Sequence, residues 1–502
     1  MQKVSVIFVL VFFIISNMNA HEEPVHQYIA REAYNLLSSS IGQIPAIRDH
    51  LGTNETGSRP WRTGLIVAGA FREDSEDPVY RYALNTLINE ALGYEAPLIA
   101  ITHFWNADAG DNAEYDVYGL GILSTPNAFI KSLHYLSPIN YGSWSLEMDW
   151  PKGETEFDTW EGEKMYLNHC GRIAFKYDDL VDLYKTGSAY VVGYLNSLGQ
   201  IVADAGLPCH IKLPEGEMRN NIVWEALGRV THLLSDMSIP AHTHNDIHPG
   251  IGFDKLDAYD DWMKYHYADQ FTDPIYGNSH WDATYASYQG SFINPYVPTH
   301  NGDIYHCIRY LFYTMNQIAD RFPSNDASGD ASYNTSYEGD DYSALNIVQQ
   351  INYPYGYGAT ENIDAYTINK YAFCYAIRAV AGLYYWFAIE TGMLNTIVVK
   401  NDFNSGQINL TVNSSTQSYS SGSSIGFLNG TTISLSTSSP QTVDNYKRYF
   451  DHWEKRNSSN GLVESSPNLT WNTTVDGNYT YIARFNREFN LTLASAQYVE
   501  TG

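Results

Sequence analysis

Residues 224–246 read WEALGRVTHLLSDMSIPAHTHND, and the remaining chain is interpreted outward from this stretch. Its apolar residues recur at the three- and four-residue spacing of an amphipathic helix. His232 and Asp236 are four positions apart, so the helix carries both on one face. Pro240 interrupts the helix, and His242 follows where the chain can turn back toward that face. Two imidazoles and a carboxylate near one point suit zinc; a buried, hydrogen-bonded His–Asp pair is the structural alternative.

The pattern HxxxDxxxxxH, formed by His232, Asp236 and His242, has a proline two positions before its last histidine. It resembles the signature of the zinc-dependent phospholipase C superfamily, which also contains the fungal single-strand nucleases. The resemblance implies a mainly helical catalytic domain that holds two or three zinc ions in one cleft. It also implies ligands scattered along the chain, one of them the first residue of the mature protein. The other ligands are therefore expected upstream, in chain order.

Residues 1–20 have the features of a secretory signal peptide. Lys3 supplies the charged start, residues 4–15 are almost unbroken apolar, and Ala20 is a small residue at the cleavage point. This apolar run is short for a permanent membrane span, which needs about 20 residues, and no later segment is judged long and apolar enough. We therefore expect a secreted or cell-surface protein with no transmembrane segment after signal removal. An uncleaved anchor is the alternative.

Cleavage after Ala20 makes His21 the first residue, and His26 follows at the start of an amphipathic helical pattern. In the superfamily, the first mature residue binds zinc through its free amine and carbonyl, and a nearby histidine joins it. The resemblance therefore assigns these places to His21 and His26. The family usually starts with tryptophan, but the ligating atoms belong to the backbone. A free α-amine binds a metal only when deprotonated, which its pKa of about 8 allows.

Two further segments offer the expected upstream ligands. The acidic cluster REDSED follows an apolar run, and Asp74 is chosen from it, with Glu73 as the competitor and an exposed acidic helix end as the structural alternative. The segment HFWNAD begins at His103 and resembles the family's His-aromatic-aromatic-Asp-Pro-Asp sequence. It departs from that sequence because Asn106 replaces the first aspartate and the proline is missing. His103 is the expected ligand.

The last zinc site of the family uses a histidine and a carboxylate with three residues between them, and no His-x-x-x-Glu follows His242. The segment LDAYDDW is interpreted as its counterpart, with Asp257 in the place of the histidine and Asp260 on the same helix face. An oxygen ligand for zinc is chemically acceptable. The alternatives that stay open are Asp261, His248 and His266.

The rest of the chain predicts a second, smaller domain. Residues 178–203 are interpreted as helical, and residues 365–391 as a long apolar helix that closes the catalytic domain. Near residue 395 the composition shifts to Ser, Thr and Asn, with alternating segments INLTVN, TTISLST and YTYIARF between glycine turns. This part resembles β-repeat modules of secreted prokaryotic proteins. After the signal peptide we expect a mainly α catalytic domain over 21–395, a small all-β domain over 396–486 and the start of a further repeat over 487–502.

The composition constrains the function. The chain has 502 residues, of which 44% are hydrophobic, so it can form a large core. A net charge of −27 repels nucleic acid and anionic membranes at long range and argues against a duplex DNA-binding protein. A phosphate substrate is compatible with this charge, because bound zinc reverses its sign locally. The four cysteines form no CxxC pair, so a cysteine-based zinc site is not expected; disulfides and buried thiols both stay open.

Taken together, the candidate ligands predict a secreted zinc-dependent phosphodiester hydrolase. The stretch from Leu227 to Asp246 is closer to the phospholipase branch, which cleaves phospholipids between glycerol and phosphate. The resemblance makes Asp236 the carboxylate that bridges two metals. Asp74 is the candidate for orienting or deprotonating the attacking water, although a carboxylate that touches zinc is too acidic for a strong base. Surface contact is expected of the β domain; a single-strand nuclease and a non-catalytic adhesion or scaffold protein are the alternatives.

Overall fold

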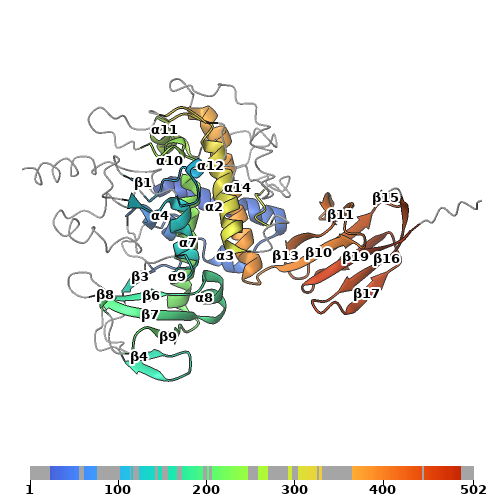
Figure 1. The fold of residues 1–502 in the computed structure, drawn as a ribbon, viewed down its shortest axis with the longest axis horizontal. Helices are drawn as coiled ribbons and strands as arrows, with labels where there is room; N and C mark the ends of the chain where they lie inside the picture. Colours follow the sequence, from blue (N-terminus) through green and yellow to red (C-terminus); the bar gives the residue numbers. More distant parts are fainter. Residues whose placement is uncertain are drawn as a thin grey trace, which may run out of the picture. The chain divides into compact units, whose positions relative to one another are not determined.

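The computed structural model divides the chain into two compact units, Met1–Thr391 and Gly392–Gly502 (Figure 1). The first is mainly helical and the second is all-β, which confirms the predicted fold class. The structure describes residues 23–55, 61–75, 102–112, 115–116, 124–141, 145–149, 156–166, 172–195, 201–202, 206–246, 258–268, 292–296, 303–324, 327–330, 365–443 and 446–487. The predicted signal peptide and almost all of the predicted further repeat lie outside these residues.

The central element of the first unit is α9 (Glu217–Asp236). All residues from 221 to 243 are buried, so this helix is covered on every side rather than on a single apolar face. Helices of the first unit pack against it, including α2 (Glu23–Ile41), α4 (Ile66–Ser75), α7 (Ala128–Leu136), α8 (Leu180–Thr186), α12 (Ile304–Ala319) and α14 (Ala365–Glu390). The smaller helices described in this unit are α3 (Pro45–Asp49), η3 (Ala107–Ala109), α10 (Pro240–Thr243) and α11 (Ala258–His266).

Helices α4 and α9 touch through their backbones at two glycines. A Cβ atom at Gly69 would lie 2.1 Å from the carbonyl oxygen of Glu225, and one at Gly228 would lie 2.0 Å from the carbonyl oxygen of Ile66. Both distances are far below van der Waals contact, so any side chain at either position would push the helices apart. This close crossing brings the last turn of α4, which carries Asp74, toward the C-terminal half of α9.

The predicted helix break at Pro240 is confirmed. Helix α9 ends at Asp236, and Pro240 is the first residue of α10. Proline suits that position because the first helical N–H has no partner within the helix in any case. His242 therefore lies in a separate short turn of helix, two residues after the proline.

The prediction that residues 178–203 are helical is wrong beyond the first turns. Helix α8 stops at Gly187, which has a φ of 79°, and β7 (Ser188–Leu195) follows at once. The sequence SAYVVGYL is rich in β-branched and aromatic residues, which favour a strand. Strand β7 belongs to an antiparallel sheet with order β3-β6-β7-β8, and β9 also pairs with β7. The strands are β3 (Leu146–Asp149), β6 (Arg172–Lys176), β8 (Ile201–Val202) and β9 (Cys209–Lys212).

Two further strand pairs are described in the first unit, β1 (Tyr115–Asp116) with β2 (Ser124–Thr125) and β4 (Glu156–Asp158) with β5 (Lys164–Tyr166). Among the described residues, Cys209, Cys307 and Cys374 form no disulfide. Cys170 lies outside the described residues.

Helix α14 covers the predicted long apolar segment almost residue for residue. Its part Tyr371–Glu390 is long and apolar enough to cross a membrane, which differs from the expectation that no later segment meets that criterion. In the structure, 94% of this segment is buried inside the protein. The helix packs against α2, α9, α11 and α12, and so forms part of the core of the first unit.

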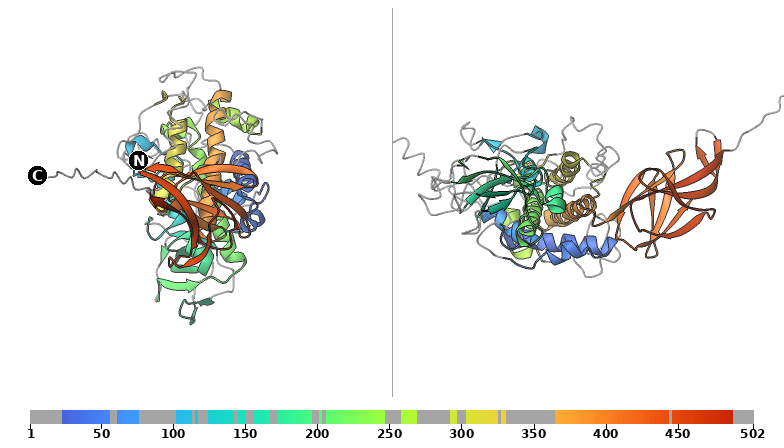
Figure 2. Two further views of the ribbon diagram at one scale, coloured as in Figure 1. Left: turned by 90° about the vertical axis from the view of Figure 1, so that its right-hand side faces the viewer. Right: turned by 90° about the horizontal axis from the view of Figure 1, so that it is seen from below.

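The second unit consists of two sheets around one apolar core (Figures 1 and 2). The first sheet has the order β13-β10-β19-β16-β15, with β17 paired to β16, and the second has the order β12-β11-β14-β18. Strand β10 is parallel to β19, and the other pairs are antiparallel. The strands are β10 (Asn395–Asn401), β11 (Gln407–Val412), β12 (Ser415–Ser420), β13 (Ser423–Phe427), β14 (Thr432–Thr437), β15 (Gln441–Val443), β16 (Tyr446–Arg456), β17 (Leu462–Ser466), β18 (Thr470–Thr474) and β19 (Tyr479–Arg487).

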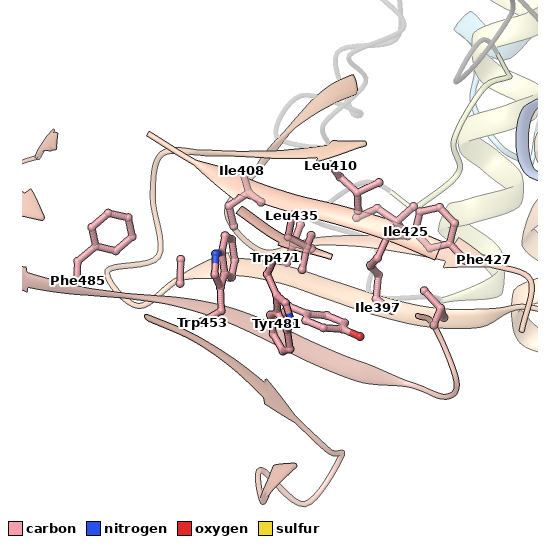
Figure 3. Packing of buried hydrophobic residues seen from close by; sticks show 14 residues of the cluster. Ile397, Ile408, Leu410, Ile425, Phe427, Leu435, Trp453, Trp471, Tyr481 and Phe485 are labelled. Atoms are coloured by element: carbon pink, nitrogen blue, oxygen red, sulfur yellow. The ribbon is translucent and has the colours of Figure 1, made fainter. Parts of the chain in front are cut away.

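Both sheets contribute side chains to the core of this unit (Figure 3). Ile397 and Trp453 come from the first sheet, and Ile408, Leu435 and Trp471 from the second. The alternation of buried and exposed residues along β11 and β14 is the pattern from which these strands are predicted.

Candidate metal centre

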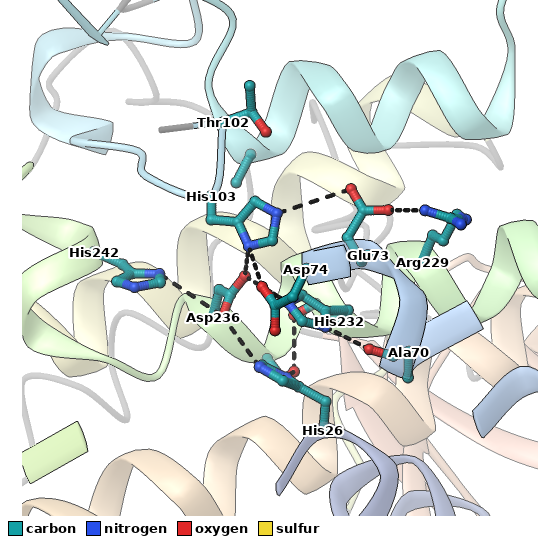
Figure 4. A network of polar contacts seen from close by, with 12 residues as sticks. His26, Ala70, Glu73, Asp74, Thr102, His103, Arg229, His232, Asp236 and His242 are labelled. Carbon is teal, nitrogen blue, oxygen red and sulfur yellow. Dashed lines mark hydrogen bonds and ion pairs between the residues drawn. The ribbon is translucent and has the colours of Figure 1, made fainter. Parts of the chain in front are cut away.

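Six of the predicted ligands lie together in one buried group, here called the histidine–aspartate cluster (Figure 4). Its members come from five segments that are far apart in the sequence: His26 in α2, Asp74 in α4, His103 before η3, His232 and Asp236 in α9, and His242 in α10. Ligand atoms of His26, His232 and Asp236 lie within 4.8 Å of one another, and so do those of Asp74, His103 and His232.

Asp236 is at the centre of the cluster and faces imidazoles with both oxygens. Its Oδ1 lies 3.5 Å from Nε2 of His26 and 3.7 Å from Nδ1 of His242. Its Oδ2 lies 2.9 Å from Nδ1 of His103 and 3.3 Å from Nε2 of His232. The carboxylate is fully buried, so its charge must be compensated by groups inside the protein. A carboxylate with two imidazoles at each oxygen is placed to bridge two cations.

A hydrogen bond to the backbone determines which nitrogen of His232 faces the cluster. Nδ1 lies 2.6 Å from the carbonyl oxygen of Ala70, and a carbonyl can only accept, so Nδ1 carries the proton. Nε2 of the neutral ring then presents a lone pair. It lies 3.4 Å from Oδ1 of Asp74 and makes no hydrogen bond of good geometry to a described residue. A lone pair that faces carboxylates repels them unless a cation lies between.

The electrostatics of His232 agree with a site that attracts positive charge. Burial by itself lowers the pKa of this imidazole, but the Asp74 and Asp236 carboxylates outweigh burial and hold the pKa well above its usual range. Either a proton or a metal ion bound at Nε2 would offset the negative charge of these two carboxylates. Metal ligands of this kind commonly donate their second ring N–H to a backbone carbonyl, as His232 does to Ala70.

Ser235 orients the ring of His26 in a similar way. Its hydroxyl donates to the carbonyl oxygen of His232 at 2.8 Å, and therefore accepts from Nδ1 of His26 at 2.7 Å. Nε2 of His26 is then the unprotonated nitrogen of the neutral ring, and it faces Asp236. The rings of His26 and His232 stack with their centroids 3.5 Å apart.

His103 favours the neutral form of its imidazole. Burial, and next the positive charge of Lys131, hold the pKa of His103 well below its usual range. Its Nδ1 lies 3.5 Å from Oδ1 of Asp74, and neither ring nitrogen makes a hydrogen bond of good geometry to a described residue. A neutral imidazole with an available lone pair is the form that binds a metal.

Glu73, the competitor of Asp74, has a different role. Its Oε1 lies 2.6 Å from Nζ of Lys131, and its Oε2 lies 2.7 Å from Nη1 of Arg229. The side chains of Glu73, Lys131 and Arg229 are all buried. Each oxygen of Glu73 therefore pairs with a cation inside the protein. Nε2 of His103 is 3.9 Å from Glu73, on the side away from Asp236. Asp74 is therefore the better candidate ligand, and its side chain is 19% exposed.

The remaining predicted ligands are not part of the histidine–aspartate cluster, as far as the described residues show. His21, Asp257 and the alternative His248 lie outside the described residues. Asp260 is half-buried on α11 and belongs to none of the three groups of closely spaced ligand atoms identified within the described parts of the chain. The alternatives Asp261 and His266 lie on the same helix, where His266 stacks on Trp262. A third ion therefore stays a prediction.

Two residues that support the site were missed in the sequence. Ser235 looks like an ordinary helical serine, and its partner His26 is 209 positions away. Lys131 lies on a mostly apolar helix, and its burial next to Glu73 follows only from the packing of α7 beside α9. A lysine within the apolar pattern of α7 is the one local signal that a buried charge partner was needed.

Comparison with known proteins adds little to this geometry. No family model matches the chain, and no curated protein matches it. Among solved structures, Clostridium perfringens alpha-toxin isolated from an avian strain matches with a TM-score of 0.31 and 11% sequence identity. The match covers 94% of this chain and 99% of that chain. At this TM-score the likeness carries no conclusion about fold or function.

Proposed function

We propose that this chain is a zinc-dependent phosphodiester hydrolase that cleaves phospholipids between glycerol and phosphate. One observation carries the proposal: two buried imidazoles, whose other ring nitrogens are held by Ser235 and Ala70, present their lone pairs to the buried carboxylate of Asp236. A set of nitrogen and oxygen donors such as this suits zinc better than calcium or magnesium.

The cluster has the donors for two neighbouring ions. His26 and Asp236 would hold one, together with the backbone of His21 if that residue is the mature N-terminus. Asp74, His103, His232 and Asp236 would hold the other. When bound, zinc supplies positive charge against the phosphodiester and makes a water molecule more acidic.

The protein's own residues orient this chemistry. Asp74 is the cluster member that is part exposed, whereas the other five side chains are buried at 1% exposure or less, so solvent reaches the cluster on the Asp74 side. Asp74 is therefore placed to orient the attacking water. Asp236 holds both halves of the cluster together, because each of its oxygens faces a different pair of rings.

The choice of a lipid over a nucleic acid rests on charge and on the sequence resemblance. A net charge of −27 opposes binding of a polyanionic strand. We further propose that the enzyme is secreted and that the second unit contacts a cell or membrane surface. Leu462 and Val463 on β17 support this contact, since they are 57% and 50% exposed.

The test combines metal content with two substrates on one sample. We expect the purified mature chain to contain two or three zinc ions by mass spectrometry, to hydrolyse a phosphocholine ester, and to lose this activity in His232→Ala. The matched control is His452→Ala, a part-exposed histidine of the second unit, which should keep both zinc and activity. Preference for single-stranded DNA would move the protein to the nuclease branch. A zinc-free chain that stays inert on both substrates after zinc addition would refute the proposal and leave a secreted scaffold.

A further inference from the structure

A second group of acidic side chains lies outside the histidine–aspartate cluster. Asp108 in η3, Asp320 directly after α12, and Asp330 have ligand oxygens within 4.8 Å of one another. We call these three residues the acidic triad. They come from three separate segments, so their approach is a product of the fold and not of local sequence. Three carboxylates this close repel one another strongly unless positive charge is supplied.

Asp320 is the buried member of the triad. It is 5% exposed, and its Oδ2 has no hydrogen-bond partner among the described residues. Burial, with further contributions from Asp108 and Asp330, raises the pKa of Asp320 well above its usual range. A buried carboxylate oxygen that lacks a donor and lies beside two other carboxylates is costly in the protein interior.

A histidine contacts the buried member of the triad. Nδ1 of His244 lies 3.2 Å from Oδ1 of Asp320, and its Nε2 lies 2.8 Å from the carbonyl oxygen of Phe322. Gln317 also donates to Oδ1 of Asp108 at 3.1 Å, but it is neutral. Arg321 also acts on Asp320 and lowers its pKa, but burial and the two other carboxylates, which raise it, have larger effects.

The backbone holds the triad in place. The N–H of Asp330 donates to the carbonyl oxygen of Asp320 at 2.8 Å. A Cβ atom at Gly329 would lie 2.2 Å from the carbonyl oxygen of Arg321, so this turn packs against the end of α12 backbone to backbone. Two of the three carboxylates are thus joined through their main chains, and the site does not depend on long flexible side chains.

We propose that the acidic triad binds one divalent hard cation, with calcium as the expected ion. All three ligands are carboxylate oxygens, the donors that calcium prefers. Asp108 is half-buried and Asp330 is exposed, so water molecules can complete the six to eight ligands that calcium takes. The acidic triad offers only oxygen ligands, whereas the histidine–aspartate cluster offers both nitrogen and oxygen ligands. The two sites are therefore expected to prefer different metal ions.

The proposed ion would join the segments that carry two predicted zinc ligands. Asp108 lies five residues after His103, and His244 lies two residues after His242. The N–H of Trp105 already donates to the carbonyl oxygen of His242 at 3.0 Å. A cation at the triad would therefore stiffen this junction. The inference goes beyond the proposed hydrolase activity and does not depend on it.

The test measures cation binding directly, without substrate. The full chain, loaded with zinc to fill the other cluster, is titrated with calcium and with magnesium by calorimetry, and its thermal unfolding is followed with and without calcium. The variants are Asp330→Asn and Asp108→Asn, which keep side-chain size; Asp158→Asn, an exposed aspartate outside the triad, is the matched control.

We expect one calcium ion per wild-type chain, a calcium-dependent rise in the unfolding temperature, and at least about tenfold weaker binding in both triad variants. Circular dichroism checks that each variant is folded, and the exposure of Asp330 makes its variant the safer one. Three results would overturn the proposal: no calcium binding by the wild type, unchanged binding in both triad variants, or an equal loss in Asp158→Asn.

Discussion

Nδ1 of His26 lies 2.7 Å from the hydroxyl oxygen of Ser235, and that hydroxyl donates to the carbonyl of His232. The serine therefore fixes the tautomer of His26. We predict that Ser235→Ala weakens zinc binding by about 10–100-fold, the usual cost of losing such a supporting partner. Competition with a chelator measures it. Ser238→Ala is the control, because its buried hydroxyl donates to the backbone carbonyl of Ser235 and not to a ring of the cluster. Equal losses in both variants would refute the role of Ser235.

Glu73 neutralises two buried cations, so its charge matters more than its shape. Glu73→Gln leaves Lys131 and Arg229 without their carboxylate and should lower the free energy of unfolding by about 3–5 kcal/mol. Tyr135→Phe removes only a neutral donor, 2.8 Å from Oε2 of Glu73, and should cost about 1 kcal/mol. Denaturant unfolding of the two variants gives the comparison. Similar costs would show that the network is held by shape rather than by charge.

The crossing of α4 and α9 has no space for a methyl group. Gly228→Ala should lower stability by at least about 1–3 kcal/mol and weaken zinc binding, since the added Cβ would meet the carbonyl of Ile66 and move Asp74 relative to α9. Gly69→Ala acts at the same contact. Chemical denaturation of the single and double variants should show that the double variant costs less than the sum. Additive costs would mean that the two glycines act independently.

In the second unit, Glu454 makes stability depend on acid. Hydrogen bonds from Arg456 and Arg484 lower its pKa to about 2. A depressed carboxyl pKa stabilises the folded state fully above its unfolded value of about 4.5, and the contribution is lost as the pH falls toward 2. The hydrogen-exchange protection of peptides from residues 395–487, corrected for the intrinsic exchange rate at each pH, should therefore fall as the pH drops over this range in the wild type.

Glu454→Gln should be less protected at neutral pH and should depend less on pH in the same range. Glu464→Gln, an exposed glutamate on β17, is the matched control and should follow the wild type. If the wild type and Glu454→Gln lose protection in parallel as the pH falls, the ion pairs of Glu454 do not stabilise this unit.

Much of the fold follows from local pattern. The helix ending at Asp236, the break at Pro240 and the long helix α14 are predicted because apolar spacing and proline act over a few residues. The strands of the second unit follow from alternation. The sheet around β7 was missed because only Gly187 separates the end of helix α8 from the start of strand β7. The apolar residues of the two elements therefore read as one continuous segment in the sequence.

The candidate site was predictable where a ligand belongs to a recognisable spacing. His232, Asp236 and His242 are near neighbours in sequence, whereas choosing Asp74 over Glu73 depends on the burial of Lys131 and Arg229, which no local pattern shows. The acidic triad was missed for the same reason, because Asp108 and Asp320 belong to segments that are far apart in the sequence. Such long-range pairings exist only after helices have packed.

The stacked rings of His26 and His232 join the first described helix to the central one. The ion that His26 and Asp236 would hold has a fully buried ligand on each helix, so we expect it to leave when α2 separates from α9 rather than on the part-exposed Asp74 side. Loss of metal to a chelator would then be a slow, first-order process whose rate does not change with chelator concentration. That rate would report how often the native protein opens along this seam, a property of its dynamics that metal affinity alone does not reveal.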